Sequence, residues 1–79
     1  MDWITEMTLH LAAATKLDAA TLLLDAEASE TLLDLAGVAA HTSGDRTNAP
    51  LLCHVLGRAV AQGATLDECA RAVREFTSQ

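Results

Sequence analysis

The sequence predicts an all-α fold: a compact bundle of four helices, with an extra short helical turn near residues 20–25. Three observations predict it. The 79 residues include 16 Ala and 13 Leu, which are both strong helix formers. Apolar residues recur at intervals of three and four along most of the chain. Capping and turn-forming residues such as Gly, Ser, Asn and Asp separate these stretches. The length allows one domain, residues 1–79.

The first helix is expected to begin after Asp2, whose side chain can cap it, and to run to about Lys16. Trp3, Met7 and Leu11 recur every four residues and form one apolar stripe on this helix. Lys16 falls in the last turn, where a cation suits the helix dipole. The three consecutive leucines at 22–24 fit a short helical turn better than a strand, which would have no partner here.

The second helix is capped by either Asp25 or Ser29 and is expected to run to about Thr42. Its apolar face is wide, which predicts contact with two neighbouring helices. Gly37 lies inside this helix, where glycine costs about 1 kcal/mol relative to alanine. We therefore expect another helix to pack closely against Gly37.

The third and fourth helices follow the clearest loop of the chain, residues 42–49. Asn48 is the expected N-cap of a third helix over residues 49–62, which is apolar on most sides and is therefore placed at the centre of the bundle. In the fourth helix, Thr65 and Glu68 have the spacing of a capping box. The apolar residues of this helix follow a helical period: Leu66, Cys69, Ala70, Val73 and Phe76.

The charge distribution is uneven and mostly acidic. The net charge is −6, and residues 1–45 hold eight acidic residues against one lysine. An acidic surface repels phosphate backbones and anionic lipids, so we expect no nucleic-acid partner and no membrane partner. No stretch approaches the roughly 20 apolar residues that span a bilayer, and acidic residues stand where a signal peptide would be basic. The expected location is the cytoplasm.

Residues that could support catalysis or metal binding are few. No Asp-Ser dipeptide is present, which argues against an acyl carrier protein. His41, Cys53, His54 and Cys69 match no compact zinc pattern, and we interpret both cysteines as buried free thiols. Neither a phosphate-binding glycine loop nor a convergent nucleophile, base and acid is recognisable. We expect no enzyme activity, no cofactor and no metal.

The turn between the second and third helices is the candidate contact site. It gathers His41, Asp45, Arg46, Asn48 and Pro50 within ten residues. The end of one helix there favours a positively charged side chain, and the free N–H groups at the start of the next could bind an anion together with Arg46. The simpler interpretation, that these residues only cap helices and fix the turn, stays open.

The same segment resembles a family of short, uncharacterised bacterial helical domains. The resemblance covers roughly residues 1–63. Within it, His41, Arg46 and Pro50 match the motif, and two further positions, Asp34 and Gly57, look structural. The matching stretches are Leu32-Leu33-Asp34-Leu35-Ala36, Ala40-His41, Arg46, Ala49-Pro50-Leu51 and Gly57, together with the amino-terminal Trp3.

Members of that family occur alone or behind a domain that looks like molybdenum cofactor guanylyltransferase. The resemblance therefore implies an accessory role near the assembly of molybdopterin guanine dinucleotide, and it implies no activity. The chain departs from the usual pattern in two ways. The interval between His41 and Arg46 is one residue longer, and His54 stands where an aromatic residue is more usual.

Two functions follow as hypotheses. The first is a non-enzymatic accessory or interaction domain that docks on a nucleotidyltransferase-like protein, on another protein of molybdoenzyme maturation, or on itself as a homo-oligomer. Its motivation is the thin core that a small, alanine-rich chain can build. The alternative is a small domain that binds an anionic ligand, a nucleotide or a pterin phosphate, through the His41–Leu51 loop.

Overall fold

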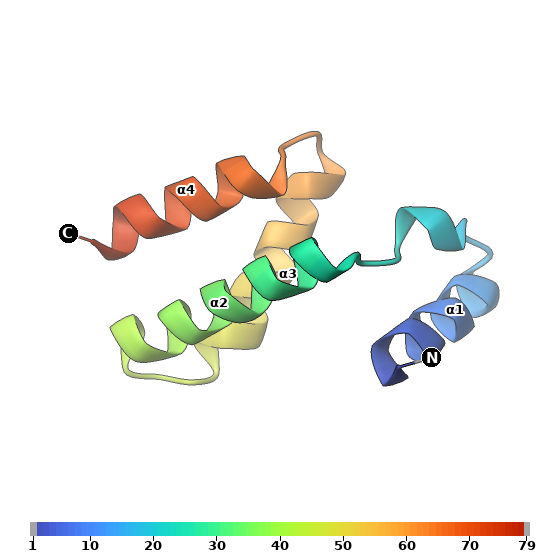
Figure 1. Cartoon of the computed structure of the whole chain (residues 1–79), viewed down its shortest axis with the longest axis horizontal. Coiled ribbons are helices and arrows are strands. Elements are labelled where there is room, and N and C mark those ends of the chain that lie inside the picture. The colour runs from blue at the N-terminus through green and yellow to red at the C-terminus, as the bar shows by residue number, and fades with distance from the viewer. Residues whose placement is uncertain (1, 79) are drawn as a thin grey trace.

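A computed structural model describes residues 2–78. These residues form four α-helices and one 3-10 turn, and none of them lies in a strand. The all-α fold class and an extra helical turn in this region are therefore confirmed, but the turn covers Ala19–Thr21 and precedes the leucines at 22–24 to which it was assigned (Figure 1). The elements are α1 (Trp3–Thr15), η1 (Ala19–Thr21), α2 (Ala26–Ser43), α3 (Asn48–Ala61) and α4 (Leu66–Thr77).

Side-chain caps fix the start of three helices, as the sequence predicts. The Asp2 carboxylate accepts a hydrogen bond from the Thr5 N–H at 2.9 Å, and the Asp25 carboxylate accepts one from the Ala28 N–H at 2.7 Å. Asp25, rather than Ser29, is thus the cap of α2. At α4 the capping box is complete. Each cap satisfies an N–H group that has no partner inside the helix.

The start of α3 differs from the prediction. Asn48 is the first residue inside the helix, and Thr47 occupies the cap position without a side-chain hydrogen bond. The Asn48 side chain instead donates to the Ser43 hydroxyl oxygen at 3.0 Å, back across the loop. The end of α1 also differs, because Lys16 adopts a left-handed conformation (φ 60°) and terminates the helix.

A core of four side chains holds α2, α3 and α4 together. Leu35, Leu56, Cys69 and Ala70 are buried, and Leu35 has no exposed surface at all. The partly buried residues around them are Leu32, Leu52, Ala59, Ala64, Leu66 and Val73. We call α2, α3 and α4 the three-helix unit. Its core is thin because an alanine side chain is small and buries little apolar area.

α1 lies apart from the three-helix unit. Its backbone packs only against η1 among the described elements, and Figure 1 shows the pair at one end of the molecule, beyond the start of α2. The molecule therefore extends over 41 × 25 × 20 Å, with a radius of gyration of 13.5 Å. A compact domain of this length has a radius of about 11.6 Å. The four helices exist as predicted, but three of them share the core.

Two packing expectations are wrong. A Cβ atom added at Gly37 would meet nothing within 4 Å, so no helix approaches it closely. The third helix is not enclosed either, because Leu51, Val55 and Val60 of α3 are exposed. Both expectations assumed a fourth helix in the core, and α1 does not occupy that place. Within residues 2–78, no helix is long and apolar enough to cross a membrane.

Candidate functional site

An apolar groove crosses the end of the three-helix unit that lies farthest from α1. It has a volume of about 510 Å³. Three segments form it: the last turns of α2, the first two turns of α3 and the last turns of α4. We call this feature the groove, and its lining residues are Ala39, Thr42, Ser43, Asn48, Leu51, Leu52, Val55, Ala72, Val73, Phe76 and Thr77. No charged residue lines it, which suits an apolar protein surface better than an ionic ligand.

Three large apolar side chains of the groove are exposed. Phe76 is 77% exposed, Leu51 62% and Val55 56%. Phe76 belongs to the apolar period of the fourth helix. That pattern holds for Cys69 and Ala70, which are buried, but Phe76 lies in the last turn, beyond the reach of the core. Helical periodicity identifies such a residue without showing whether the domain itself covers it.

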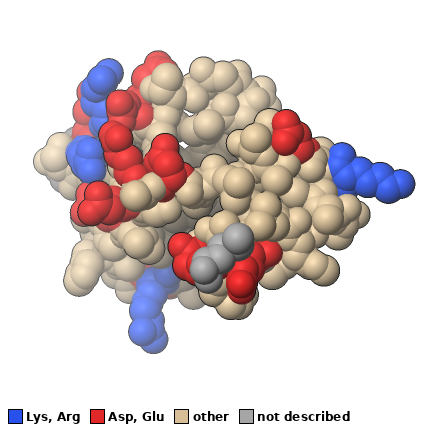
Figure 2. All heavy atoms as spheres, turned by 45° about the vertical axis from the view of Figure 1, so that its right-hand side comes forward, with Lys and Arg blue, Asp and Glu red and all other residues tan. Residues whose placement is uncertain are grey.

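A second apolar surface lies on α1. We call it the α1 stripe: Trp3, Ile4, Met7 and Leu11, all exposed, with Trp3 at 73%. Trp3 and the buried Ala12 are nine residues apart, which places them on opposite sides of a helix. Trp3 and Met7 thus lie on the side of α1 opposite to Ala12. In Figure 2, which turns the α1 end of the molecule forward, wide areas between the acidic side chains carry no charged group.

The predicted contact loop is internally bonded. The Asp45 carboxylate accepts hydrogen bonds from the Thr47 N–H at 2.9 Å and from the Thr47 hydroxyl at 2.6 Å. These two bonds, the side-chain bond first, lower the pKa of Asp45 from its usual value of 3.8. Asn48 is tied to Ser43, whose hydroxyl donates to the Ala39 carbonyl at 2.6 Å. Asp45 and Asn48 therefore form hydrogen bonds that fix the shape of the loop.

The start of α3 offers few free donors to an anion. The Asn48 N–H donates to the Asp45 carbonyl and the Ala49 N–H to the Arg46 carbonyl, both at 3.1 Å. The Thr47 N–H is taken by Asp45, and Pro50 has no N–H. An anion site at a helix start depends on unbonded N–H groups. The free N–H groups that the sequence predicted here are thus largely used within the loop.

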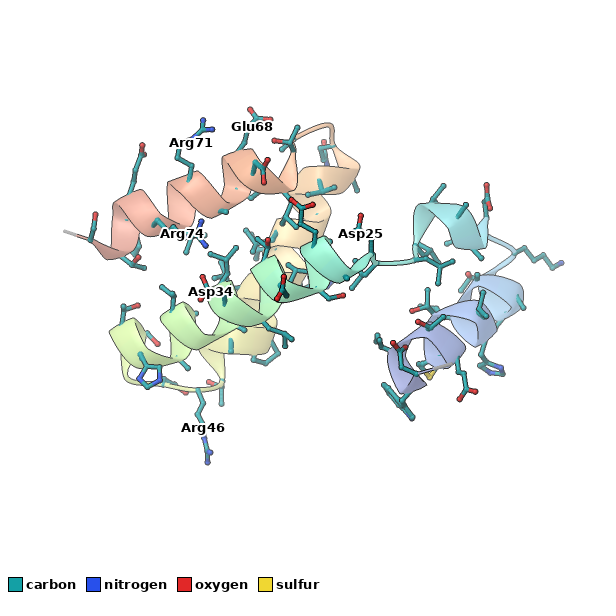
Figure 3. The ribbon with its side chains drawn as sticks, viewed as in Figure 1. Asp25, Asp34, Arg46, Glu68, Arg71 and Arg74 are labelled. Atoms are coloured by element: carbon teal, nitrogen blue, oxygen red, sulfur yellow. The ribbon has the colours of Figure 1, made fainter. Side chains whose placement is uncertain are left out.

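The remaining loop residues do not converge. The Arg46 side chain is exposed and projects away from the helices (Figure 3). His41 is exposed on α2 and lines a different, shallow hollow of about 390 Å³ together with Leu33 and Val38. Pro50 is exposed in the first turn of α3. The structure places Asn48 in the lining of the groove, whereas His41, Arg46 and Pro50 are exposed and do not line it.

The residues considered for a metal also stay apart. Cys53 and Cys69 are both free thiols; Cys69 is buried and Cys53 partly buried. The Cys53 thiol lies 3.9 Å from the Leu32 carbonyl oxygen, as a weak hydrogen bond between α3 and α2. Over residues 2–78, no group of three or more His, Cys, Asp or Glu side chains could hold a metal ion.

Sequence reasoning missed the groove itself. The sequence does contain an indication of it: Leu51, Val55 and Phe76 make the apolar surface of α3 and α4 wider than the core requires. Sequence periodicity could not show that α1 lies elsewhere and leaves them uncovered.

Comparison with known proteins gives one match. No curated protein and no solved structure matches the chain. A family model described as "Domain of unknown function (DUF6457)" matches residues 1–79, which is the whole chain. The prediction of an uncharacterised small helical domain is confirmed at that level. The chain belongs to the DUF6457 family of domains of unknown function.

Proposed function

We propose that this chain is a non-enzymatic interaction domain whose contact surface is the groove. The observation that carries the proposal is the exposure of Leu51, Val55 and Phe76 in one apolar groove that has no charged lining residue. Grooves of this kind accept the apolar face of an amphipathic helix. Exposed clustered apolar side chains are also unfavourable in water, so a partner that covers them gains free energy.

The arrangement of polar groups supports a role without catalysis. Catalysis by side chains requires a nucleophile, a base and an orienting group within hydrogen-bond distance of each other. Here the loop carboxylate of Asp45 is bonded to Thr47, and the Cys53 thiol to a backbone carbonyl. His41 is exposed on α2, and the exposed side chain of Arg46 projects away from the helices (Figure 3).

A finer proposal concerns the biological context. The sequence resembles domains that stand alone or follow a domain like molybdenum cofactor guanylyltransferase, so we propose an accessory role in the assembly of that cofactor. The partner in this proposal is a guanylyltransferase-like protein, and the domain itself would bind neither the nucleotide nor the pterin. This context rests on the resemblance, whereas the groove rests on the structure.

The test is an amide NMR titration of the isotope-labelled full chain with a purified molybdenum cofactor guanylyltransferase. We expect broadening centred on groove residues of α3 and α4, such as Val55 and Phe76. In the variant Val55→Asp this response should disappear. Leu33→Asp is the matched control, because Leu33 is equally apolar and 73% exposed but lies on α2 outside the groove.

The outcomes separate the two levels of the proposal. No response to the guanylyltransferase contradicts the cofactor context. A response confined to the loop at Arg46, unchanged in Val55→Asp, contradicts the groove as the contact surface. Loop shifts on addition of GTP alone would instead support the ligand-binding hypothesis.

A further inference from the structure

The surface of the molecule is too large for a folded monomer of its size. The accessible surface is 6016 Å² for a mass of 8.3 kDa. The usual scaling for monomeric proteins gives about 4,600 Å² at this mass. The excess is about 1,400 Å², against the roughly 800 Å² that each partner contributes to a standard protein interface. The chain therefore exposes enough surface for a stable interface.

α1 has too little support to stand alone. It has 13 residues and packs against η1 only, among the described elements. Isolated helices shorter than about 12–15 residues are marginal in water, and most helices gain their stability by burying an apolar face. In α1 that face is the α1 stripe, which the described part of the chain leaves uncovered. The α1 stripe and the groove are both apolar and exposed, so each could cover the other.

The fold places the two surfaces at opposite ends of the same molecule. The groove is formed by the end of α2, whereas α1 and η1 precede its start (Figure 1). The 18 residues of α2 separate these ends by about 27 Å. At the far end the α1 backbone contacts η1, the Leu17 N–H closes the end of α1 by donating to the Ala12 carbonyl, and the Thr21 N–H closes η1 by donating to the Asp18 carbonyl. For α1 to bind in the groove of its own chain, this end of the molecule would have to rearrange. Binding of α1 in the groove of another copy requires no such rearrangement.

The charges flanking the two surfaces are opposite. Between Arg46 and Leu66 the chain has no Asp or Glu, and Arg58 continues the line of Leu51 and Val55 along the exposed side of α3. Glu6 lies beside the α1 stripe, in the first turn of α1. An α1 helix laid antiparallel to α3 places Glu6 near Arg58, because Glu6 is early in one helix and Arg58 late in the other. Complementary charge of this kind fixes the direction in which partners dock.

We propose that the groove of one copy takes the α1 stripe of a second copy, and that the exchange is reciprocal. Two molecules aligned antiparallel along the 41 Å axis bring each α1 to the partner's groove, which closes a two-fold symmetric dimer. The combined area, about 2,800 Å² if both excesses are covered, is in the range of obligate homodimers. This inference rests on the proposed function, because it identifies the partner at the same groove.

The test is sedimentation equilibrium of the full chain from micromolar to millimolar concentration, with variants on each side of the interface. The wild type should shift from 8.3 kDa to twice that mass. Val55→Asp should raise the dimer dissociation constant by more than about tenfold, since it places a charge at the interface centre. Leu33→Asp, outside both surfaces, should leave it unchanged.

A pair of charge reversals tests the orientation without disturbing the fold, because both side chains are exposed. Glu6→Arg and Arg58→Glu should each weaken the dimer by about three- to tenfold, and the double variant should recover most of the loss. A wild type that stays monomeric throughout the concentration range overturns the inference. This holds also if the monomer results from α1 binding in the groove of its own chain. If that monomer still binds the guanylyltransferase through the groove, the proposed function stands without the dimer.

Discussion

The guanidinium of Arg74 in α4 donates a 2.9 Å hydrogen bond to the carboxylate of Asp34 in α2 (Figure 3). Among residues 2–78 it is the one ion pair. It joins the two helices above the core, but both side chains remain more than half exposed, at 54% and 61%. Water and salt therefore weaken the attraction between the two charges.

Removal of this ion pair should have a small effect. We expect Arg74→Ala to lower the free energy of unfolding by about 0.2–1 kcal/mol, as exposed ion pairs usually do. The measurement is urea denaturation of wild type, Arg74→Ala, Asp34→Ala and the double variant, at low and at high salt. A coupling energy well above that range, or one that salt does not reduce, would show that the pair is less solvated than its exposure indicates.

Leu35 should dominate the stability of the three-helix unit. It is fully buried against Leu56, Cys69 and Ala70, so Leu35→Ala removes apolar contacts and leaves a cavity. The expected loss is about 2–5 kcal/mol, a large part of the stability of a domain this small. The matched control is Leu33→Ala, two residues away in α2 and 73% exposed, with an expected change within about 0.5 kcal/mol. Similar losses for both leucines in thermal unfolding would contradict the assigned core.

Acid should destabilise the start of α4. The Thr65 N–H donates to the Glu68 carboxylate at 2.9 Å, and this bond is the largest cause of a Glu68 pKa below the usual 4.5. A carboxyl group whose pKa is lowered by folding stabilises the protein above its unfolded pKa, and the benefit is lost as the pH falls through the folded pKa. Stability should therefore decline on acidification below 4.5.

The matched variant for this prediction is Glu68→Gln, which keeps the shape of the side chain but cannot ionise. It should melt at a lower temperature than the wild type at neutral pH, and the difference should shrink in acid. Circular dichroism melts across the acidic range provide the measurement. An unchanged difference between the two proteins at every pH would mean that the ionised capping box does not contribute to stability.

The His41–Leu51 loop should bind small anions poorly. Its N–H groups at residues 47–49 are bonded within the loop, and the exposed Arg46 side chain projects away from the helices (Figure 3). Titration with inorganic phosphate or GTP, followed by amide NMR, should give small, non-saturating shifts that are equal in wild type and Arg46→Ala. Saturable shifts that vanish in Arg46→Ala would favour the ligand-binding alternative.

Local features of the fold could be predicted from the sequence because they depend on neighbouring residues. The capping box at Thr65 and Glu68 and the cap at Asp25 require only residues within four positions of each other. The apolar period of the fourth helix likewise identified Cys69 and Ala70 as core residues. At Asn48 the same reasoning failed, because Ser43 competes for its side chain across the loop.

The groove could not be predicted because it depends on which helices share the core. An apolar stripe indicates a face that prefers to be buried, and it does not identify the covering partner. Trp3 and Met7 were grouped with the bundle for this reason, although their helix packs only on η1. The loop posed a similar problem. The sequence places Asp45 and Asn48 close together, but it does not show whether they bond within the loop, as they do to Thr47 and Ser43, or bind a ligand.

The fluorescence of Trp3 tests the central claim, that these apolar surfaces are covered by protein, most directly. Trp3 is the one tryptophan of the chain and is 73% exposed in the single molecule. We predict an emission maximum typical of a buried indole at high protein concentration, which shifts to that of a solvated indole on dilution. The variant Val55→Asp should show solvated emission at concentrations where the wild type does not. Solvated emission from the wild type at every concentration would contradict the account.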